Sequence, residues 1–191
     1  MNAPTLHGAR VVLRDWTERD LAPFAQMNAD PEVMRHLLAR LTPDESDALV
    51  QRIRAHFRTH GFGLWALDVP QADGAKRFAG FVGLSARVPF ELPLDGVVKP
   101  PHEIGWRLAR WAWGHGFASE GATLALRHAF DAVGLRQVVS FTATINRASQ
   151  AVMQRIGLTL RGEFEHPRIA EGHPLRSHLL YAQDAPMKAM S

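Results

Sequence analysis

Three strand-like segments follow one another in the middle of the chain with no helix between them. Residues 62–69 and 76–88 flank the turn-like sequence PQADGA, and residues 102–110 follow a proline-rich stretch, VPFELPLDGVVKPP. A regular alternation of strands and helices builds a parallel sheet, so a run of adjacent strands favours a mixed sheet with helices on its faces. The proline-rich stretch is either an ordinary surface connection or a mobile flap over a site.

Helices are predicted on both sides of these strands. The clearest covers residues 42–61, where Thr42 can cap, Pro43 fits the first helical position and Gly61 ends the pattern. The other helical patterns cover residues 17–30 and 145–157, with one helical turn in 30–37, and residues 111–134 form a glycine-rich turn that leads into a long helix. Further strands are predicted at 9–16, 137–144, 158–167 and 175–183.

These elements define a fold of the α/β class, of the α+β type. We expect about six or seven strands and about four helices around one core. The 191 residues fit one domain of ordinary size, which we assign to residues 1–184. Residues 185–191 are expected to form a flexible tail.

Composition and charge exclude several classes of protein. The chain has no cysteine, which rules out a thiol nucleophile, a disulfide framework and a zinc–cysteine site, and which fits a cytoplasmic location. Its first residues carry charge too early for a signal peptide, and no apolar run is long enough to cross a bilayer, so no membrane partner is expected. The net charge is only +3, with the arginines dispersed, so no nucleic-acid partner is expected either.

A cluster of histidines and arginines lies near the C-terminal end, in EHPRIAEGHPLRSH. It contains His166, His173 and His178, together with Arg168 and Arg176. No HExxH motif or closely paired ligand spacing is present, so we expect no metal site. Exposed loop residues, or a rim that contacts substrate, are the favoured interpretation.

A glycine-rich turn between a strand and a helix is the most informative motif. The segment from Glu103 to Glu120 reads EIGWRLARWAWGHGFASE, with glycines at 114 and 116. Glycines let the backbone approach a phosphate closely, and a helix start presents unpaired N–H groups. The GxGxxG and GxxxxGK[ST] motifs are absent, since Ser119 stands where the third glycine belongs. This disfavours a nucleotide-binding oxidoreductase and a P-loop NTPase.

The same segment resembles motif A of the GCN5-related N-acetyltransferase (GNAT) superfamily, especially its RimJ/RimL-like branch. The residues that match the branch pattern are Glu103, Ile104, Gly105, Trp106, Leu108, Trp113, Gly114, Gly116, Phe117, Ala118, Ser119 and Glu120. The segment departs from the pattern at Arg110, Ala112 and Gly121. Trp111 stands where the wider family often has Gln or Arg, so phosphate binding would depend more on backbone donors.

A second segment, TATINRASQAVMQRIGLTLRGEF, is similar to another signature of this branch. The matching residues are Asn146, Ser149, Arg155, Gly157 and Leu158. Two motifs in the right order, separated by a strand and a helix, are more specific than either one alone. The resemblance covers nearly the whole chain and is least convincing across residues 86–101.

The resemblance implies a largely antiparallel, twisted sheet that is splayed between its fourth and fifth strands, with acetyl-CoA as cosubstrate. The pantetheine arm would pair with the main chain of Trp106 and Leu108. The pyrophosphate would lie on the turn formed by Trp113, Gly114, His115, Gly116, Phe117 and Ala118. Asn146 would orient water or the cofactor amide. Arg155 is either a contact for the 3′-phosphate or a solvated helix residue.

The implied reaction is direct attack by an amine on the thioester in a ternary complex. Glu103 is the leading candidate for the base, and its alternative is a strand-end carboxylate paired with an arginine. Many relatives protonate the thiolate with a tyrosine, but Met153 occupies that position here and Tyr181 is the only tyrosine in the chain. Ser149 is therefore the candidate acid. Helix capping is the alternative role for both Asn146 and Ser149.

The resemblance leaves the acceptor and the acyl donor open. The acceptor would be a protein N-terminus or a small-molecule amine, selected by the variable segments 86–101 and 163–178. Succinyl-CoA or another acyl-CoA could replace acetyl-CoA, and a homodimer is possible. A module that binds CoA as a sensor without transferring an acyl group is the competing hypothesis.

Overall fold

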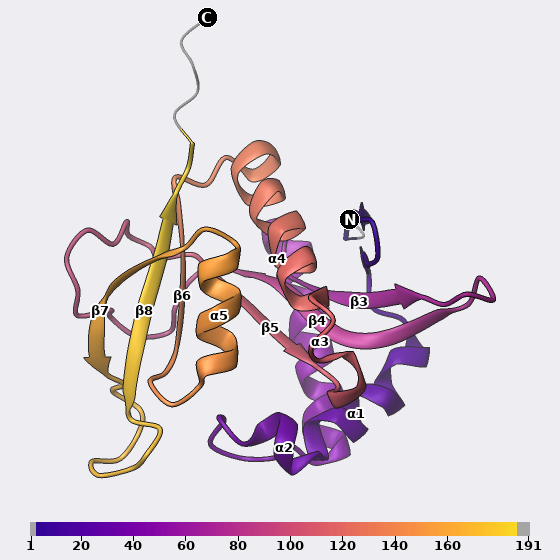
Figure 1. The fold of residues 1–191 in the computed structure, drawn as a ribbon, viewed down its shortest axis with the longest axis horizontal. Coiled ribbons are helices and arrows are strands. Elements are labelled where there is room, and N and C mark those ends of the chain that lie inside the picture. The colour runs from indigo at the N-terminus through magenta and orange to yellow at the C-terminus, as the bar shows by residue number, and fades with distance from the viewer. Residues whose placement is uncertain (1–2, 187–191) are drawn as a thin grey trace, which may run out of the picture.

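An eight-stranded sheet organises residues 3–186, the part of the chain that the computed structural model describes (Figure 1). Its strand order is β1-β2-β3-β4-β5-β6-β8-β7. The strands are β1 (Leu6–His7), β2 (Val12–Arg14), β3 (Leu64–Pro70), β4 (Lys76–Ser85), β5 (Glu103–Leu108), β6 (Gln137–Ala143), β7 (Thr159–Glu165) and β8 (Ser177–Asp184). Neighbouring strands are antiparallel except β5 and β6, which confirms the mixed, largely antiparallel sheet.

The strand and helix counts are slightly higher than predicted. The additional strand is the two-residue β1, which pairs with β2 and is too short to leave a pattern in the sequence. The α-helices are α1 (Leu21–Ala29), α2 (Pro31–Met34), α3 (Pro43–His60), α4 (Phe117–Arg127) and α5 (Arg147–Arg155). The short helical turns are η1 (Glu18–Asp20), η2 (Arg110–Ala112) and η3 (His128–Val133). The fifth helix is α2, where only a helical turn was predicted.

Capping residues fix the ends of α3 as the sequence predicted. The Thr42 side chain accepts a hydrogen bond from the Glu45 N–H, and the Glu45 side chain accepts one from the Thr42 N–H. Pro43 occupies the first turn, and Gly61 ends the helix with a φ of 76°. That left-handed conformation is readily available only to glycine.

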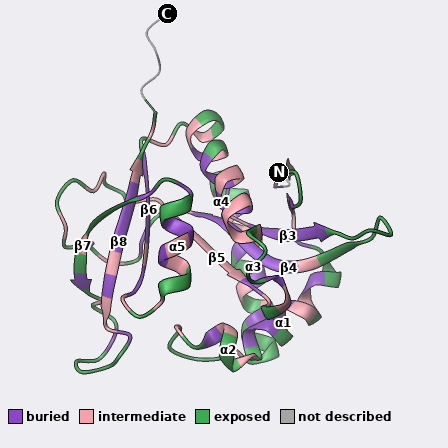
Figure 2. Ribbon diagram, in the orientation of Figure 1, coloured by how far each residue is buried: buried purple, intermediate pink, exposed green. Residues whose placement is uncertain are grey.

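Helix α4 lies directly on one face of the sheet because small residues line its inner side. A Cβ atom at Gly121 would lie 2.9 Å from the Leu67 side chain and 3.3 Å from that of Val82. Ala122 and Ala125 are fully buried. The opposite face of the same strands packs against α1, where Phe24 contacts Phe81 edge to face. Buried residues accordingly line the sheet and the inner sides of the helices (Figure 2).

Strands β5 and β6 touch at one end and then diverge. Their register contains the single pair Glu103–Val139, whereas β4 and β5 are paired along the whole of β5. The Val139 N–H donates to the His102 carbonyl, and the Ser140 hydroxyl donates to the Ile104 carbonyl, both at 2.8 Å. Beyond this junction the ribbons separate (Figure 1). The predicted splay is confirmed, between the strands that were expected to be fourth and fifth.

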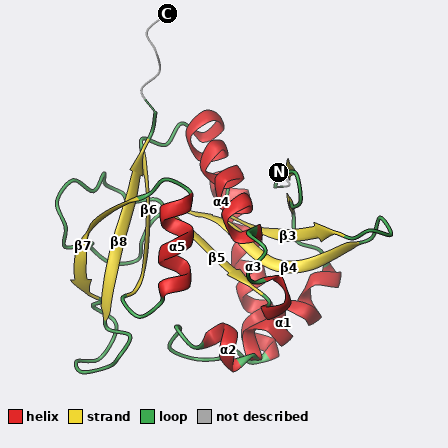
Figure 3. Cartoon of the chain, viewed as in Figure 1, coloured by secondary structure: helices red, strands yellow, loops and turns green. Residues whose placement is uncertain are grey.

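The segment 86–102 contains no helix or strand (Figure 3). Two of its apolar side chains, Val88 and Leu92, are buried in a cluster with Val139, Phe164 and Leu180. The segment therefore packs over the β6–β8–β7 part of the sheet. No helix among residues 3–186 has the length and apolar character that spanning a bilayer requires. The predicted tail falls largely on residues 187–191, which lie outside the described residues.

Candidate active site

The turn between β5 and α4 is exposed and ends in an uncapped helix start. Gly114 and Gly116 have φ values of 78° and 81°, and Gly116 is the N-cap of α4 without a side-chain cap bond. The first helical bond runs from the Glu120 N–H to the Gly116 carbonyl at 3.0 Å. The preceding N–H groups, from Phe117 to Ser119, have no partner within the helix. Such a helix start attracts anions through its free donors and its dipole.

Two aromatic side chains of the turn have structural contacts of their own. The Trp113 indole N–H donates to the Leu108 carbonyl at 2.8 Å, which ties the turn to the end of β5. The His115 ring stacks on Phe117, with centroids 5.4 Å apart and an interplanar angle of 26°. Both side chains therefore stabilise the shape of the turn, and its glycines remain open to solvent.

Arg10, which the sequence did not single out, connects this turn to the β1–β2 hairpin. Its guanidinium donates to the His115 carbonyl and to a Glu120 carboxylate oxygen, each at 2.9 Å. Its main-chain N–H donates to the other Glu120 oxygen at 2.6 Å. A half-exposed cation thus lies beside the uncapped helix start. No local pattern reveals a contact between residues 110 positions apart.

The edge of β5 that faces the gap has main-chain groups without a strand partner. The Ala109 N–H donates to the Ala79 carbonyl at 2.8 Å. In an antiparallel pair the main-chain N–H and carbonyl groups face the partner strand at every second residue, so those of Gly105 and Arg107 also face β4. The main chain of Trp106 and Leu108 faces β6 instead. The Leu108 carbonyl is bonded by Trp113, but the β5–β6 register ends before Trp106. An open edge of this kind can pair with an extended chain that carries amides.

Glu103 lies at the junction where β5 and β6 meet. Among residues 3–186 its carboxylate has no hydrogen-bond or ion-pair partner, so no arginine pairs with it there. Burial raises the pKa of this carboxyl to about 7. A carboxylate with such a pKa accepts a proton effectively near neutral pH.

Asn146 and Ser149 form the N-terminal cap of α5. The Asn146 side-chain oxygen accepts the Ser149 N–H at 3.3 Å. The Asn146 amide donates to the hydroxyl oxygens of Thr142 and Ser149, at 2.9 and 3.1 Å. The capping role is therefore real for both residues. Because Ser149 accepts a bond from Asn146, its own hydroxyl hydrogen remains available to another group.

The other expected residues are placed differently. Met153 and Tyr181 are only 1% and 3% exposed and belong to the main core. Arg155 is exposed in the last turn of α5, at the opposite end of the helix from Asn146. His166 and His178 do come together, with ring centroids 4.9 Å apart. Among residues 3–186, no group of three or more potential ligands is arranged to hold a metal ion.

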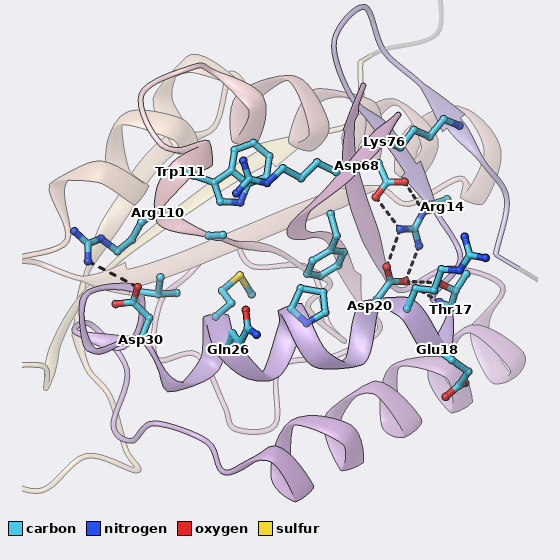
Figure 4. A pocket seen from close by; sticks show the side chains of 17 residues that line it. Arg14, Thr17, Glu18, Asp20, Gln26, Asp30, Asp68, Lys76, Arg110 and Trp111 are labelled. Carbon is cyan, nitrogen blue, oxygen red and sulfur yellow. Dashed lines mark hydrogen bonds and ion pairs between the residues drawn. The ribbon is translucent and has the colours of Figure 1, made fainter. Parts of the chain in front are cut away.

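A groove of about 970 Å³ lies between α1, β4 and η2, away from the expected site (Figure 4). Arg14 occupies its floor and bonds two buried carboxylates, Asp20 and Asp68, at 2.6–2.8 Å. The guanidinium offsets one of the two negative charges, and the pKa of Arg14 is raised by its two carboxylate partners despite burial. On the rim, the Arg77 guanidinium lies 3.9 Å from the centre of the Trp111 ring. The lining includes neither Glu103 nor the turn of residues 113–118.

Comparison with known proteins relates residues 10–159 to the acetyltransferase (GNAT) domain model. An Aspergillus fumigatus protein named FsC-acetyl coenzyme A-N(2)-transacetylase is 36% identical over 160 residues, covering 82% of this chain and 65% of that protein. A GNAT-family acetyltransferase from Bacillus anthracis has a similar structure, with a TM-score of 0.76 at 18% identity over 95% of this chain and 98% of that one. Mycobacterium smegmatis RimJ, solved with CoA-disulfide, gives a TM-score of 0.74 at 22% identity over 95% and 88%.

Proposed function

Because this chain belongs to the GNAT acetyltransferase family, we propose that it transfers the acetyl group of acetyl-CoA to a primary amine. The observation that carries the proposal is the splay itself, which leaves the Trp106 main chain unpaired beside an uncapped helix start. The pantetheine arm of CoA is extended, carries amides and ends in a pyrophosphate, so it fits both the unpaired strand edge and the helix start. The fungal relative, of which this chain spans about two thirds, has a name that describes acetyl transfer from coenzyme A to a nitrogen.

The cofactor would lie along the gap, with its pyrophosphate on the turn of residues 113–118. The N–H groups of Phe117 and Ala118 would donate to phosphate oxygens, and the half-exposed Arg10, whose charge Glu120 offsets, would add further N–H donors. Trp106 would pair with the pantetheine through its main-chain N–H and carbonyl. Leu108 would contribute only its N–H, because Trp113 already bonds its carbonyl. Arg155 is the least supported of the proposed contacts, given its place at the far end of α5.

The thioester supplies an activated acyl carbon, and side chains of the protein accept and donate the protons. The acceptor amine loses a proton to Glu103 as its nitrogen bonds the carbonyl carbon. When the carbon–sulfur bond breaks, Ser149 donates its hydroxyl proton to the departing thiolate and is reprotonated by solvent. Asn146 acts as a positioning residue, because its amide fixes the Ser149 oxygen.

The proposal is tested by calorimetry with CoA and by an assay of thiol release from acetyl-CoA with a panel of amines. We expect a saturable CoA site and acceptor-dependent release of free thiol. Absence of CoA binding would overturn the assignment. Tight CoA binding without transfer to any amine would favour the sensor hypothesis, which the burial of Met153 at the usual tyrosine position motivates. Comparing acetyl-CoA with succinyl-CoA identifies the donor.

A further inference from the structure

Arg107 is a half-buried cation without an anionic partner in the described part of the chain. Its guanidinium donates one hydrogen bond, to the Asn28 side-chain oxygen at 2.6 Å, and lies 5.4 Å from the centre of the Phe81 ring. Among residues 3–186 no carboxylate lies within ion-pair distance of it. Burial lowers its pKa to about 10. A guanidinium has five N–H donors, so most of its bonding capacity is unused.

The bond to Asn28 holds Arg107 in a fixed place. Asn28 is fully buried, and its amide donates to the Ser46 hydroxyl of α3 at 2.9 Å. This leaves its oxygen to accept from Arg107. Orientation by a neutral partner positions a cation without neutralising it. A buried charge that remains uncompensated is expensive, so its presence points to a ligand that supplies the opposite charge.

Arg107 and Glu103 belong to the same face of β5, and Gly105 lies between them. Alternate residues of a strand share a face, so these three positions point the same way. A Cβ atom at Gly105 would have no atom within 4 Å, and the residue paired with it on β4 is also a glycine, Gly83. The strand face between the carboxylate and the guanidinium is therefore open.

This face lies away from the turn that would hold the pyrophosphate. Phe81, paired with Arg107, packs against Phe24 of α1. Val82, paired with Trp106, packs instead beneath Gly121 of α4, on the other side of the sheet. Arg107 is thus on the α1 side, whereas the uncapped helix start belongs to the α4 layer. The guanidinium is placed to meet the acceptor and not the cofactor phosphates.

We propose that Arg107 binds a carboxylate of the acceptor, so that the substrates are amines carrying a carboxylate several bonds from the reacting nitrogen. This inference depends on the proposed acetyl transfer. Arg107 lies four residues after Glu103, so their Cα atoms are about 13 Å apart, at roughly 3.3 Å per residue. The two side chains cover part of that span, and the remainder sets how many bonds separate the amine from the carboxylate of the acceptor. The planar fork of arginine suits a carboxylate through two parallel hydrogen bonds.

The test compares ω-amino carboxylates, from glycine to aminooctanoate, with their neutral methyl amides as acceptors for the intact protein. We expect kcat/KM to favour the carboxylates by at least about tenfold at an intermediate chain length, because a charged bidentate contact is lost in the amides. Arg107→Met should abolish this preference through the KM of the acceptor, and Arg107→Lys should keep part of it. The KM of acetyl-CoA should be unchanged. Arg52→Met, at an exposed position of α3, is the matched control.

Equal kcat/KM values for the carboxylates and the amides would overturn the inference. So would a preference for carboxylates that survives in Arg107→Met. An Arg107→Met variant in which only the KM of acetyl-CoA changes would also overturn it. Melting curves of each variant establish that it folds. If no amine in the panel is acetylated, a second readout decides. The CoA-bound protein should then be stabilised by ω-amino carboxylates only when Arg107 is present, and no stabilisation would refute the inference. Failure to bind CoA at all would instead count against the proposed function.

Discussion

At the residue scale, the half-buried Glu103, as the proposed base, is expected to link activity to stability. No described cation neutralises it, and burial raises its pKa to about 7. We expect Glu103→Gln to lower kcat by about 10²–10⁴-fold, the usual contribution of a general base. Asp131→Asn, an exposed change in η3, is the control. Steady-state thiol release measures the effect, and an unchanged kcat would remove Glu103 from the mechanism.

The same carboxyl predicts how stability depends on pH. Its folded pKa of about 7 exceeds the ordinary value of 4.5, so the folded state binds the proton more tightly than the unfolded state. This contribution is fully present below pH 4.5 and is lost as pH rises through about 7, at roughly 1.4 kcal/mol per pH unit. Glu103→Gln should flatten this decline and be the more stable form at pH 8, as measured by urea unfolding. Parallel pH profiles for both proteins would contradict the assignment.

The rate should change with pH in the opposite direction. As the proposed base, Glu103 would work only when it is ionised, so kcat/KM should rise as pH increases through about 7. The titratable groups nearest in the chain are His102, whose pKa is lowered by burial, and Lys99 and Arg107, each four residues away. A rate profile that Glu103→Gln leaves unshifted would assign the ionisation to another group.

At the scale of elements, the turn into α4 depends on left-handed glycines. Gly116→Ala places a Cβ at a φ of 81° and 3.3 Å from the Arg10 guanidinium. The altered turn should raise the KM of acetyl-CoA by about tenfold and cost roughly 1–2 kcal/mol of stability. Gly74→Ala is a close control, because Gly74 has the same φ of 81° in the β3–β4 turn. If both variants raise the KM of acetyl-CoA equally, the turn has no special role.

Local patterns predicted most elements and the motifs they carry. The caps of α3, the glycine turn and the adjacent strands depend on near neighbours in sequence, so they could be read directly. The two-residue β1 is too short to show an alternation of apolar and polar residues. The contacts of Arg10 with Glu120 and of Arg107 with Asn28 join positions 110 and 79 residues apart. The packing of α4 and α1 against the sheet brings those side chains together, so the sequence could not predict them.

At the scale of the whole molecule, the sheet consists of two parts joined at one strand pair. Strands β1 to β5 pair in order, as do β6, β8 and β7, but Glu103–Val139 is the single register pair between the two groups. CoA in the gap should bridge the two parts. At a concentration of about 100 times its Kd, it should add roughly 2.7 kcal/mol of stability. Hydrogen exchange should show new protection at the Trp106 and Leu108 amides, and protection confined to other regions would place the ligand elsewhere.

The bare strand face at Gly105 also bears on how readily specificity can change. The residue adopts no left-handed backbone, and an added Cβ would meet nothing within 4 Å. A methyl group there would meet no neighbouring atom, yet it would occupy the floor between Glu103 and Arg107. If the proposed acceptor lies on this floor, replacing Gly105 by alanine should restrict the protein to slimmer acceptors at little cost in stability.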